Sequence, residues 1–141
     1  MFLLTSCLND SNDTSTYYGD TAITAFTLGT LNRYTHVKTS TGKYSTYKTT
    51  LTGSSYYFYI DQVNKTIYNP DSLPIWTDNS KVVCTITSKN GGLIYGKSLK
   101  SDSIFYHNSS DSVDFSQPRT FYVYATDGSG YRQYTIKVNV H

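Results

Sequence analysis

Thr120-Phe-Tyr-Val-Tyr-Ala-Thr-Asp-Gly-Ser-Gly-Tyr-Arg-Gln-Tyr-Thr-Ile-Lys-Val-Asn-Val140 is the stretch that decides the fold class of this chain. Because successive side chains of a strand point to opposite faces, its apolar residues mark one face of each of two strands. Those residues are Phe121, Val123 and Ala125 in the first half, and Tyr134, Ile136, Val138 and Val140 in the second. The connector Asp127-Gly128-Ser129-Gly130 suits a tight turn, since glycine adopts positive φ without a Cβ clash. The stretch predicts an antiparallel hairpin with one buried face.

The second strand of this hairpin is expected to carry much of the stability. From Tyr134 to Val140 it has no proline or glycine that would interrupt its hydrogen-bond ladder. Burying side chains of this size contributes roughly 1.5–3 kcal/mol each. We therefore expect Ile136→Ala and Val138→Ala each to lower the free energy of unfolding by about 2 kcal/mol or more.

The rest of the chain contains further short segments rich in Thr, Tyr, Val and Ile, which favour strands. We expect strands over residues 22–28, 34–39, 44–51, 56–60, 66–68, 81–88, 93–95 and 104–106. Turns at 40–43 and 61–65 predict two more hairpins, and the aromatic run Tyr56–Ile60 is expected to be a central strand. The segment Asn69–Pro74 contains two prolines, so it should cross between sheets or around an edge.

These elements predict the fold class. No segment shows helical periodicity over more than one turn, and no apolar span is long enough for a transmembrane helix. The 141 residues include 38% hydrophobic and 16% aromatic residues, which is enough for the core of one domain. We predict an all-β fold, an immunoglobulin-like antiparallel β-sandwich that occupies residues 22–141.

The N-terminal residues predict where in the cell the protein is located. Leu4-Thr5-Ser6-Cys7 resembles a bacterial lipobox, at which a signal peptidase cuts before a cysteine that carries lipid. Met1–Leu4 contain neither a charged segment nor a full apolar one, so residues 1–7 are interpreted as a truncated or misassigned lipoprotein signal, with a chance match to the lipobox as the alternative. Residues 8–21 are polar and predict a flexible tether. We therefore expect the membrane as a partner, through a lipid anchor on Cys7 at the outer membrane or the cell surface.

The second cysteine and the net charge support two further predictions. Cys84 lies in a predicted strand and is interpreted as a buried free thiol. The formal charge of +2 comes from 12 basic and 10 acidic residues, and no cluster of Lys and Arg stands out along the sequence. We therefore expect no nucleic-acid partner.

Several of the quoted segments together resemble a known family. They are residues 23–28, the hairpin at 34–51, Tyr57-Phe-Tyr-Ile-Asp61, Tyr68-Asn-Pro-Asp-Ser-Leu-Pro74, Asp114-Phe-Ser-Gln-Pro118 and Tyr134-Thr-Ile-Lys-Val138. This order is similar to immunoglobulin-like modules of Bacteroidetes surface lipoproteins. It is closer still to one family of unknown function, in which such a module stands ahead of a larger propeller-like domain. The resemblance covers roughly residues 2–141. It implies an architecture, a place in the cell envelope and a downstream domain as a partner, and it carries over no catalytic residue.

Residue types that support catalysis or metal binding are present without the spacing that either needs. The histidines are His36, His107 and His141, which we interpret as solvated or capping residues because they lack the short spacing of metal ligands. No Gly-x-Ser-x-Gly motif accompanies the many serines. The acids that flank loops are Asp71, Asp78, Asp102, Asp111 and Asp114, and in loops Asp usually accepts hydrogen bonds from its own backbone. We predict no enzymatic activity, no metal and no cofactor.

A modification pattern recurs along the chain. Asp followed by Ser or Thr and then an apolar residue resembles the O-glycosylation sequon of exported Bacteroidetes proteins. The hydroxyl residues of the four matches are Thr21, Ser72, Ser103 and Ser112. The last three lie in predicted loops, where a glycan would be accommodated.

Three functions remain open from the sequence. The first is a non-catalytic lipoprotein module that acts as a spacer or an interaction domain. The second is carbohydrate binding, because sugar rings stack on exposed aromatic faces. The candidate residues for such stacking are Trp76, Tyr44, Tyr47, Tyr95 and Tyr106, with Tyr17 in addition. The third is a fimbrial or adhesin-type subunit that polymerises by strand exchange, for which a detachable terminal strand is needed.

Overall fold

The computed structural model describes residues 21–141, which contain twelve β-strands and two 3-10 turns. The strands are β1 (Ile23–Leu28), β2 (Thr30–Lys38), β3 (Tyr44–Thr52), β4 (Tyr59–Asp61), β5 (Thr66–Tyr68), β6 (Thr77–Asp78), β7 (Val82–Ser88), β8 (Leu93–Lys97), β9 (Ile104–Tyr106), β10 (Ser112–Val113), β11 (Arg119–Tyr124) and β12 (Tyr131–Lys137). The two turns are Gly53–Ser55 and Lys89–Gly91. The predicted all-β class is confirmed.

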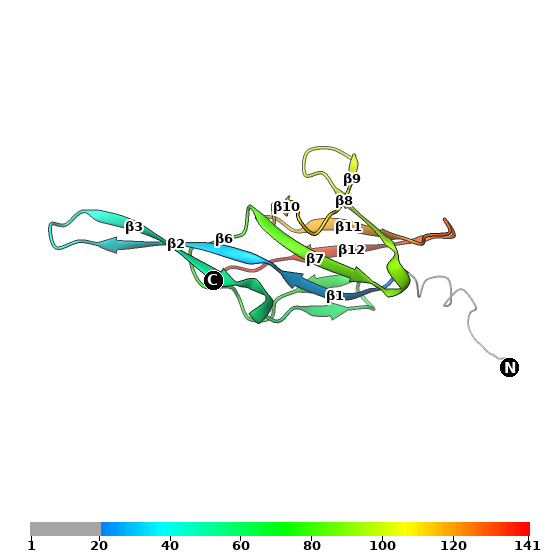
Figure 1. Cartoon of the computed structure of the whole chain (residues 1–141), viewed down its shortest axis with the longest axis horizontal. Coiled ribbons are helices and arrows are strands. Elements are labelled where there is room, and N and C mark those ends of the chain that lie inside the picture. The colour runs from blue at the N-terminus through cyan, green and yellow to red at the C-terminus, as the bar shows by residue number, and fades with distance from the viewer. Residues whose placement is uncertain (1–20) are drawn as a thin grey trace.

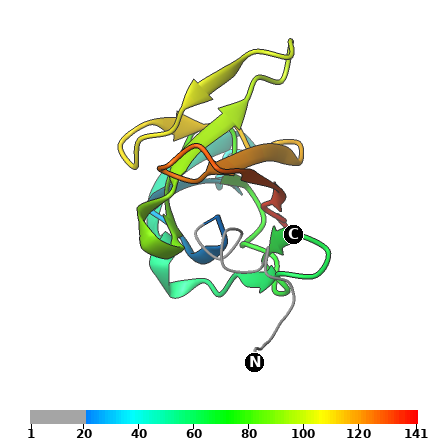
Figure 2. The ribbon, with the colours of Figure 1, turned by 90° about the vertical axis from the view of Figure 1, so that its right-hand side faces the viewer.

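The strands form two layers around one core. One layer is a six-stranded sheet of order β4-β5-β12-β11-β8-β9. The other is made of two three-stranded sheets, β1-β7-β10 and β3-β2-β6. Figure 1 shows strands such as β1, β7, β11 and β12 running roughly along the long axis, and Figure 2 shows the layers enclosing the interior when the molecule is seen end-on. The strands pair antiparallel, as predicted for the sandwich, and the one parallel pair among the named strands of residues 21–141 is β5 with β12.

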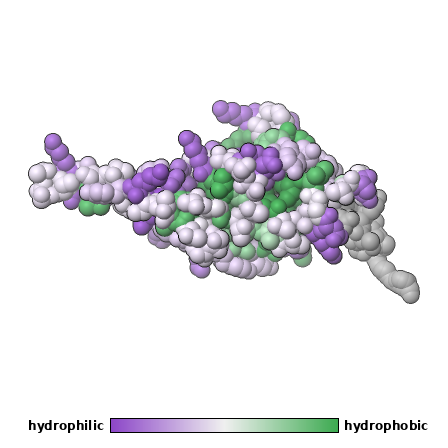
Figure 3. Space-filling model, viewed as in Figure 1, coloured by the Kyte–Doolittle hydropathy of each residue, from purple (hydrophilic) through white to green (hydrophobic). Residues whose placement is uncertain are grey.

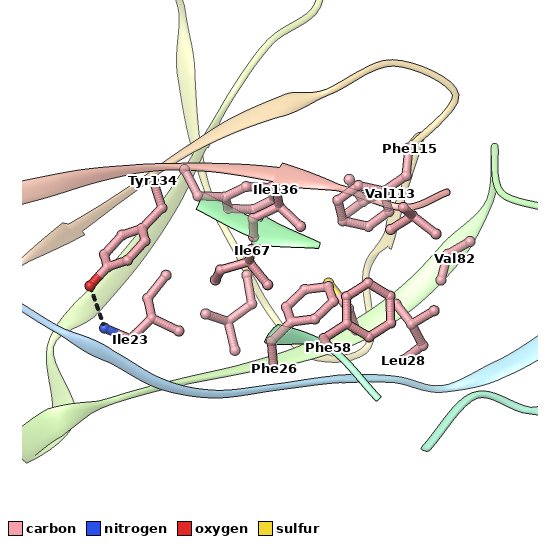
Figure 4. Close-up of a cluster of buried hydrophobic side chains, with 14 of the residues drawn as sticks. Ile23, Phe26, Leu28, Phe58, Ile67, Val82, Val113, Phe115, Tyr134 and Ile136 are labelled. Carbon is pink, nitrogen blue, oxygen red and sulfur yellow. Dashed lines mark hydrogen bonds between the residues drawn. The ribbon is translucent and has the colours of Figure 1, made fainter. Parts of the chain in front are cut away.

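Side chains from both layers meet in a continuous apolar cluster. Figure 4 shows Tyr134, Ile136 and Ile67 of the six-stranded sheet facing Ile23 and Phe26 of β1. Phe26 contacts the ring of Phe58 edge to face, with 4.9 Å between ring centroids. The residues of this cluster that are at most 1% exposed are Ile23, Leu31, Ile67, Leu73, Val82, Cys84, Phe115, Phe121, Val123, Tyr134 and Ile136.

The predicted C-terminal hairpin is confirmed. β11 and β12 pair antiparallel from Arg119 with Ile136 to Tyr124 with Tyr131. The inward residues of the quoted stretch are buried from Phe121 to Val138, whereas Val140 is half-buried and lies beyond β12, which ends at Lys137 rather than at Val140. β12 lies inside the sheet, with β11 on one side and β5 on the other. Its location agrees with the expectation that this strand is well paired.

Strand β1 departs from simple alternation. Its buried residues are Ile23, Phe26 and Leu28, and its register against β7 shifts between Ile23 and Ala25. This β-bulge adds one residue, so that Ile23 and Phe26 both reach the core although three positions separate them. Alternation across residues 22–28 alone would have placed them on opposite faces.

The aromatic run Tyr56–Ile60 is not a central strand, so that prediction was wrong. Only Tyr59–Asp61 forms a strand, β4, and it lies at one edge of the six-stranded sheet. Tyr57 and Tyr59 are 68% and 42% exposed, and Phe58 alone turns fully into the core. Aromatic residues favour strands at the edge of a sheet as well as in its centre, so the aromatic run did not distinguish the two positions.

The predicted crossing segment is confirmed at Asn69–Pro74. It leaves β5 in one layer and leads to β6 in the other. Asn69 is fully buried and holds the crossing by donating Nδ2 to the carbonyl oxygens of Asp71 (3.1 Å) and Asn139 (2.8 Å). Asn139 N donates in return to Asn69 Oδ1 at 2.7 Å. The crossing is thereby tied to the end of the chain, where Leu73 and Val140 form an isolated parallel bridge.

One hydrogen bond passes through the core between the layers. Ile23 N in β1 donates to the hydroxyl of Tyr134 in β12 over 3.1 Å, as the dashed line in Figure 4 shows. The same hydroxyl donates to Gln62 Oε1. Gln62 Nε2 donates to the carbonyl oxygen of Ile23 over 2.7 Å. A buried backbone amide of β1 is satisfied by a side chain of the opposite layer.

The outer part of the β2–β3 hairpin projects beyond the two layers, whereas Leu31 at its base is buried in the core. Its strands pair without interruption from Thr30 with Thr52 to Lys38 with Tyr44. In Figure 1 it extends to the left, away from the rest of the sandwich. We call residues 30–52 the arm. Gly42, at φ +84°, closes its tip, where Gly42 N donates to Thr39 O over 2.9 Å.

Candidate binding surfaces

The outer face of the six-stranded sheet collects tyrosines from four adjacent strands. We call Tyr106 of β9, Tyr95 of β8, Tyr122 and Tyr124 of β11, and Tyr131 of β12 the tyrosine face. Strand alternation places them there, because the adjacent residues Ile94, Phe121 and Val123 point into the core. Tyr131 lies an odd number of positions from the buried Tyr134 and so faces the other way. Register brings them together, since Tyr95 pairs with both Tyr106 and Tyr122, and Tyr124 pairs with Tyr131.

The rings of this face touch one another continuously. Tyr95 contacts Tyr106 and Tyr124, each with 5.5 Å between centroids, at interplanar angles of 73° and 89°. Tyr131 contacts Tyr124 at 5.3 Å and 33°, and Tyr122 at 6.0 Å and 67°. Such edge-to-face pairs are favoured by the ring quadrupole. The rings therefore share no common plane, and the surface is uneven rather than flat.

Exposure within the tyrosine face is greatest at its two ends. Tyr106 is 50% exposed and Tyr131 is 52% exposed, whereas the three rings between them are half-buried. Each ring offers an apolar body and a hydroxyl that remains hydrated or bonds to a partner. The face is suited to contact another surface of mixed polarity.

A second group of aromatic and basic residues lies on one side of the arm. Directly opposed residues of an antiparallel pair project to the same side. The pairs on this side are Tyr34 with Lys48, His36 with Thr46, and Lys38 with Tyr44. His36 Nδ1 lies 3.0 Å from Thr46 Oγ1, and the ring of Trp76 packs edge to face on His36 at 5.3 Å. We call these six residues and Trp76 the arm face.

Trp76 is held against the arm in an unusual backbone conformation. Its φ is +71°, a left-handed conformation that costs a residue with a Cβ about 1–2 kcal/mol. Neighbouring bonds maintain it, because Tyr34 N donates to Trp76 O over 3.2 Å and Arg33 Nε donates to Ile75 O over 2.8 Å. Thr77 then pairs with Arg33 in the β2–β6 ladder. The indole is 44% exposed beside His36.

The five tyrosine and tryptophan residues predicted to contact glycans do not form one site. Tyr95 and Tyr106 belong to the tyrosine face, and Trp76 and Tyr44 belong to the arm face. Tyr47 pairs with Thr35 on the other side of the arm. Tyr17 lies outside the described residues.

Sequence reasoning missed several members of both surfaces. Tyr122 and Tyr124 alternate with Phe121 and Val123 in the stretch that predicts the hairpin, and the same alternation could have placed them on the outer face. The basic residues of the arm were missed because they are spread along the sequence. They are Arg33, Lys38, Lys43 and Lys48, and residues 30–52 contain no acid.

The thiol prediction is confirmed, and the interpretation of one histidine was wrong. Cys84 is free and 1% exposed, and burial raises its pKa to about 12. His107 is 6% exposed rather than solvated, and its Nε2 donates to Cys84 O over 3.1 Å. Because that nitrogen carries the proton, its 3.7 Å approach to Cys84 Sγ is a packing contact. A neutral, buried thiol of this kind is a poor nucleophile.

Several acidic residues take the turn roles expected of them. Asp78 Oδ1 accepts hydrogen bonds from Ser80 N (2.9 Å) and Ser80 Oγ. Hydrogen bonds from the side chain and the backbone of Ser116 lower the pKa of the Asp114 carboxyl. Asp102 instead lies 3.4 Å from Lys97 Nζ as an exposed ion pair. Within residues 21–141, no three His, Cys, Asp or Glu side chains gather closely enough to hold a metal ion.

Arg119 is a structural residue on the core side of β11. Its Nη1 donates to Asp114 O (2.9 Å) and its Nη2 to Lys97 O (2.8 Å), which ties two loops to the sheet. Burial lowers the pKa of Arg119, and the charge of Asp114 opposes that shift. Both donated bonds end on backbone carbonyls, so these atoms are occupied within the fold.

The predicted modification sites differ in accessibility. Ser72 and Ser103 are exposed in loops, and Ser112 is exposed within β10 rather than in a loop. Thr21 is 0% exposed, so its hydroxyl is out of reach of an enzyme in the folded domain. Modification at the four residues stays a prediction, and so does the boundary of the tether.

Two predictions concern the membrane. Cys7 and the lipobox lie outside the described residues. Among residues 21–141, no helix has the length and apolar character to cross a bilayer.

Comparison with known proteins assigns a family. The family described as "Domain of unknown function (DUF6242) N-terminal domain" matches residues 26–138. The match begins within β1 and ends just after β12, so it spans both layers of the sandwich. The chain belongs to this family. No curated protein matches the chain. The family match agrees with the expected domain of unknown function, and it assigns no ligand to either surface.

Proposed function

We propose that this domain is a non-catalytic interaction module of a cell-envelope lipoprotein, and that its tyrosine face docks against the domain that follows in the same polypeptide. The observation that carries this proposal is the unbroken contact of five tyrosine rings across four strands on the outside of a sheet. The family is described as an N-terminal domain, which supports a following domain as the partner.

The chemistry of the tyrosine face favours a protein partner. Tyrosine is enriched at protein interfaces because one side chain supplies both apolar area and a hydrogen-bonding hydroxyl. The rings stand at 33° to 89° to one another, so they would fit an irregular protein surface better than a flat polysaccharide. Gln133, which pairs with Tyr122, adds an exposed amide at the same face.

The proposed location is the outer membrane or the cell surface, with a lipid on Cys7. It rests on the Leu4–Cys7 pattern and on the resemblance to Bacteroidetes lipoproteins. The immunoglobulin-like assignment also stays a proposal, supported by the two-layered sandwich. Mass spectrometry of the protein made in a suitable bacterium from a full-length signal tests the anchor. An unmodified Cys7 behind an uncleaved leader would exclude it.

Hydroxyl-radical footprinting tests the docking. Tyrosine oxidation is compared between the 141-residue chain and the full product of its gene. We expect Tyr106 and Tyr131 to be protected in the full product, and Tyr44 on the arm, which is 71% exposed, to be labelled equally in both. Equal labelling of Tyr106 and Tyr131 would refute docking, and so would a reading frame that stops at His141.

A matched pair of variants tests the role of individual rings. The Tyr106→Ser and Tyr131→Ser double variant should release the protection of the remaining rings in the full product. Tyr57→Ser serves as the control, because Tyr57 is 68% exposed on the β4 side of the sheet. If the control releases protection as strongly as the double variant, the tyrosine face is not the docking surface.

The strand-exchange alternative is less well supported. Donor-strand exchange needs a terminal strand that leaves its sheet. β12 is hydrogen-bonded on both sides, so its removal would break two ladders and expose Ile136. A monodisperse monomer at high concentration would exclude polymerisation by this route.

A further inference from the structure

We propose that the arm face binds an acidic polysaccharide, with Trp76 and Tyr44 stacking on sugar rings and Lys38 and Lys48 pairing with the carboxylates of the polymer. This site is separate from the tyrosine face. The choice of a polysaccharide over other anionic polymers rests on the proposed cell-envelope location.

The arm has a net positive charge, whereas the rest of the chain does not. Residues 30–52 contain four of the 12 Lys and Arg residues and none of the 10 acids, so the remainder holds eight basic against ten acidic residues. Figure 3 shows the arm mostly in white to purple with a small green area, in contrast to the larger hydrophobic patches of the body. Charges on a projecting element attract oppositely charged polymers without competition from neighbouring acids.

The charges and the aromatic rings lie on the same side of the arm. Lys38 is directly opposite Tyr44, and Lys48 is directly opposite Tyr34. His36 lies between these pairs and carries the ring of Trp76. Successive pairs on one side of a ribbon are about 7 Å apart, so cations and rings form a row along the strands. A row of this kind suits an extended polymer.

The aromatic rings are available for stacking. Tyr44 is 71% exposed and Trp76 is 44% exposed. The ring of Trp76 is held by its contact with His36 and its backbone by the hydrogen bond from Tyr34 N, so little side-chain freedom would be lost on binding. Lysine ammonium groups form charge-assisted hydrogen bonds to carboxylates. Stacking and ion pairing together are the interactions that an acidic sugar polymer offers.

The composition of the arm face disfavours insertion into a lipid bilayer. Insertion buries apolar side chains below the headgroups. The arm face contains Tyr, His, Lys, Thr and Trp but no aliphatic residue, and the exposed Val37 pairs with Ser45 on the opposite side. Contact with a polar polymer needs no such insertion.

Trp76 provides a direct readout, because it is the one tryptophan among the 141 residues. The 141-residue chain is titrated with polygalacturonate, which bears one carboxylate per sugar, and with neutral dextran. We expect polygalacturonate to change the fluorescence of Trp76 and dextran to leave it unchanged. Affinity should fall as NaCl is added, since salt screens exposed charges.

Matched charge variants locate the site. Lys38→Gln with Lys48→Gln should weaken polygalacturonate binding about tenfold or more, because two charge-assisted contacts are lost. Lys89→Gln with Lys100→Gln removes the same charge from exposed positions outside the arm and should leave affinity within about twofold. Tyr44→Ala should weaken binding several-fold. Because the side chain of Tyr44 is exposed, this loss would not result from unfolding. Equal loss in both lysine pairs, or no loss in the arm pair, would overturn the proposal.

Two further probes separate the other anionic partners. Phosphatidylglycerol vesicles are tested by co-sedimentation, and a single-stranded oligonucleotide by the same fluorescence titration. Tighter binding to either than to polygalacturonate would overturn the polysaccharide assignment. Footprinting of Tyr106 and Tyr131 is independent of all these titrations, so failure at the arm face is distinguishable from failure at the tyrosine face.

Discussion

Replacing Tyr134 by phenylalanine tests how the two layers are joined near the start of β1. The ring volume is preserved, so the change removes only the hydroxyl. That hydroxyl accepts a hydrogen bond from Ile23 N over 3.1 Å and donates one to Gln62 Oε1. Tyr134 and Ile23 are both 0% exposed, so water does not reach this bond in the folded domain.

The expected loss follows from the two bonds. A buried amide left without a partner costs about 1–3 kcal/mol, which applies to Ile23 N. Gln62 is exposed and regains a hydrogen bond from water, so the second bond contributes about 1 kcal/mol. Tyr134→Phe should therefore lower the free energy of unfolding by about 2–4 kcal/mol, which even at the lower bound is roughly a 30-fold change in the ratio of folded to unfolded protein.

Urea unfolding followed by circular dichroism measures the effect. The midpoint should fall while the m value stays constant, because the surface exposed on unfolding is unchanged. Tyr131→Phe is the matched control, since Tyr131 is 52% exposed on the same strand and should change stability by less than about 0.5 kcal/mol. In a double-mutant cycle, Tyr134→Phe and Gln62→Ala should be non-additive. A Tyr134→Phe effect no larger than that of the control would refute the role assigned to this bond.

Four other changes have defined outcomes. Ile136→Ala should cost about 2–5 kcal/mol in chemical unfolding, because Ile136 is 0% exposed; a loss below about 1 kcal/mol would contradict its place in the core. Gly53→Ala should cost about 2–3 kcal/mol in thermal unfolding, because its Cβ would lie 2.1 Å from Gly29 O, and an unchanged Tm would show that this contact relaxes freely. Asp114 has a lowered folded pKa, so its stabilisation is present above about pH 3.8 and is lost as the pH falls through the folded value; acid unfolding of Asp114→Asn should lack this component. Cys84 should react with a thiol reagent only on global unfolding, in a chain whose other cysteine is serine, because its pKa is about 12 and it is 1% exposed; rapid labelling of native protein would contradict this.

The candidate surfaces were predicted only in part from the sequence. Exposed aromatic residues were recognised one by one, including Trp76 and Tyr106, because composition and turn context indicate exposure. Their grouping could not be predicted, since β8, β9, β11 and β12 meet through pairings between residues distant in sequence. Nothing local to Trp76 indicates that β6 would hold it beside His36.

The amino-acid sequence by itself determined the features that depend on neighbouring residues. The alternation of Phe121, Val123 and Ile136, with a glycine turn between the two strands, predicts a hairpin and its buried face, because side chains two residues apart share a face. Only the tertiary structure decided which strands lie side by side. It placed β12 parallel to β5, left Tyr59 on an edge, and inserted the bulge that turns both Ile23 and Phe26 inward. Those outcomes depend on how the whole chain buries its apolar area, a quantity that no single segment contains.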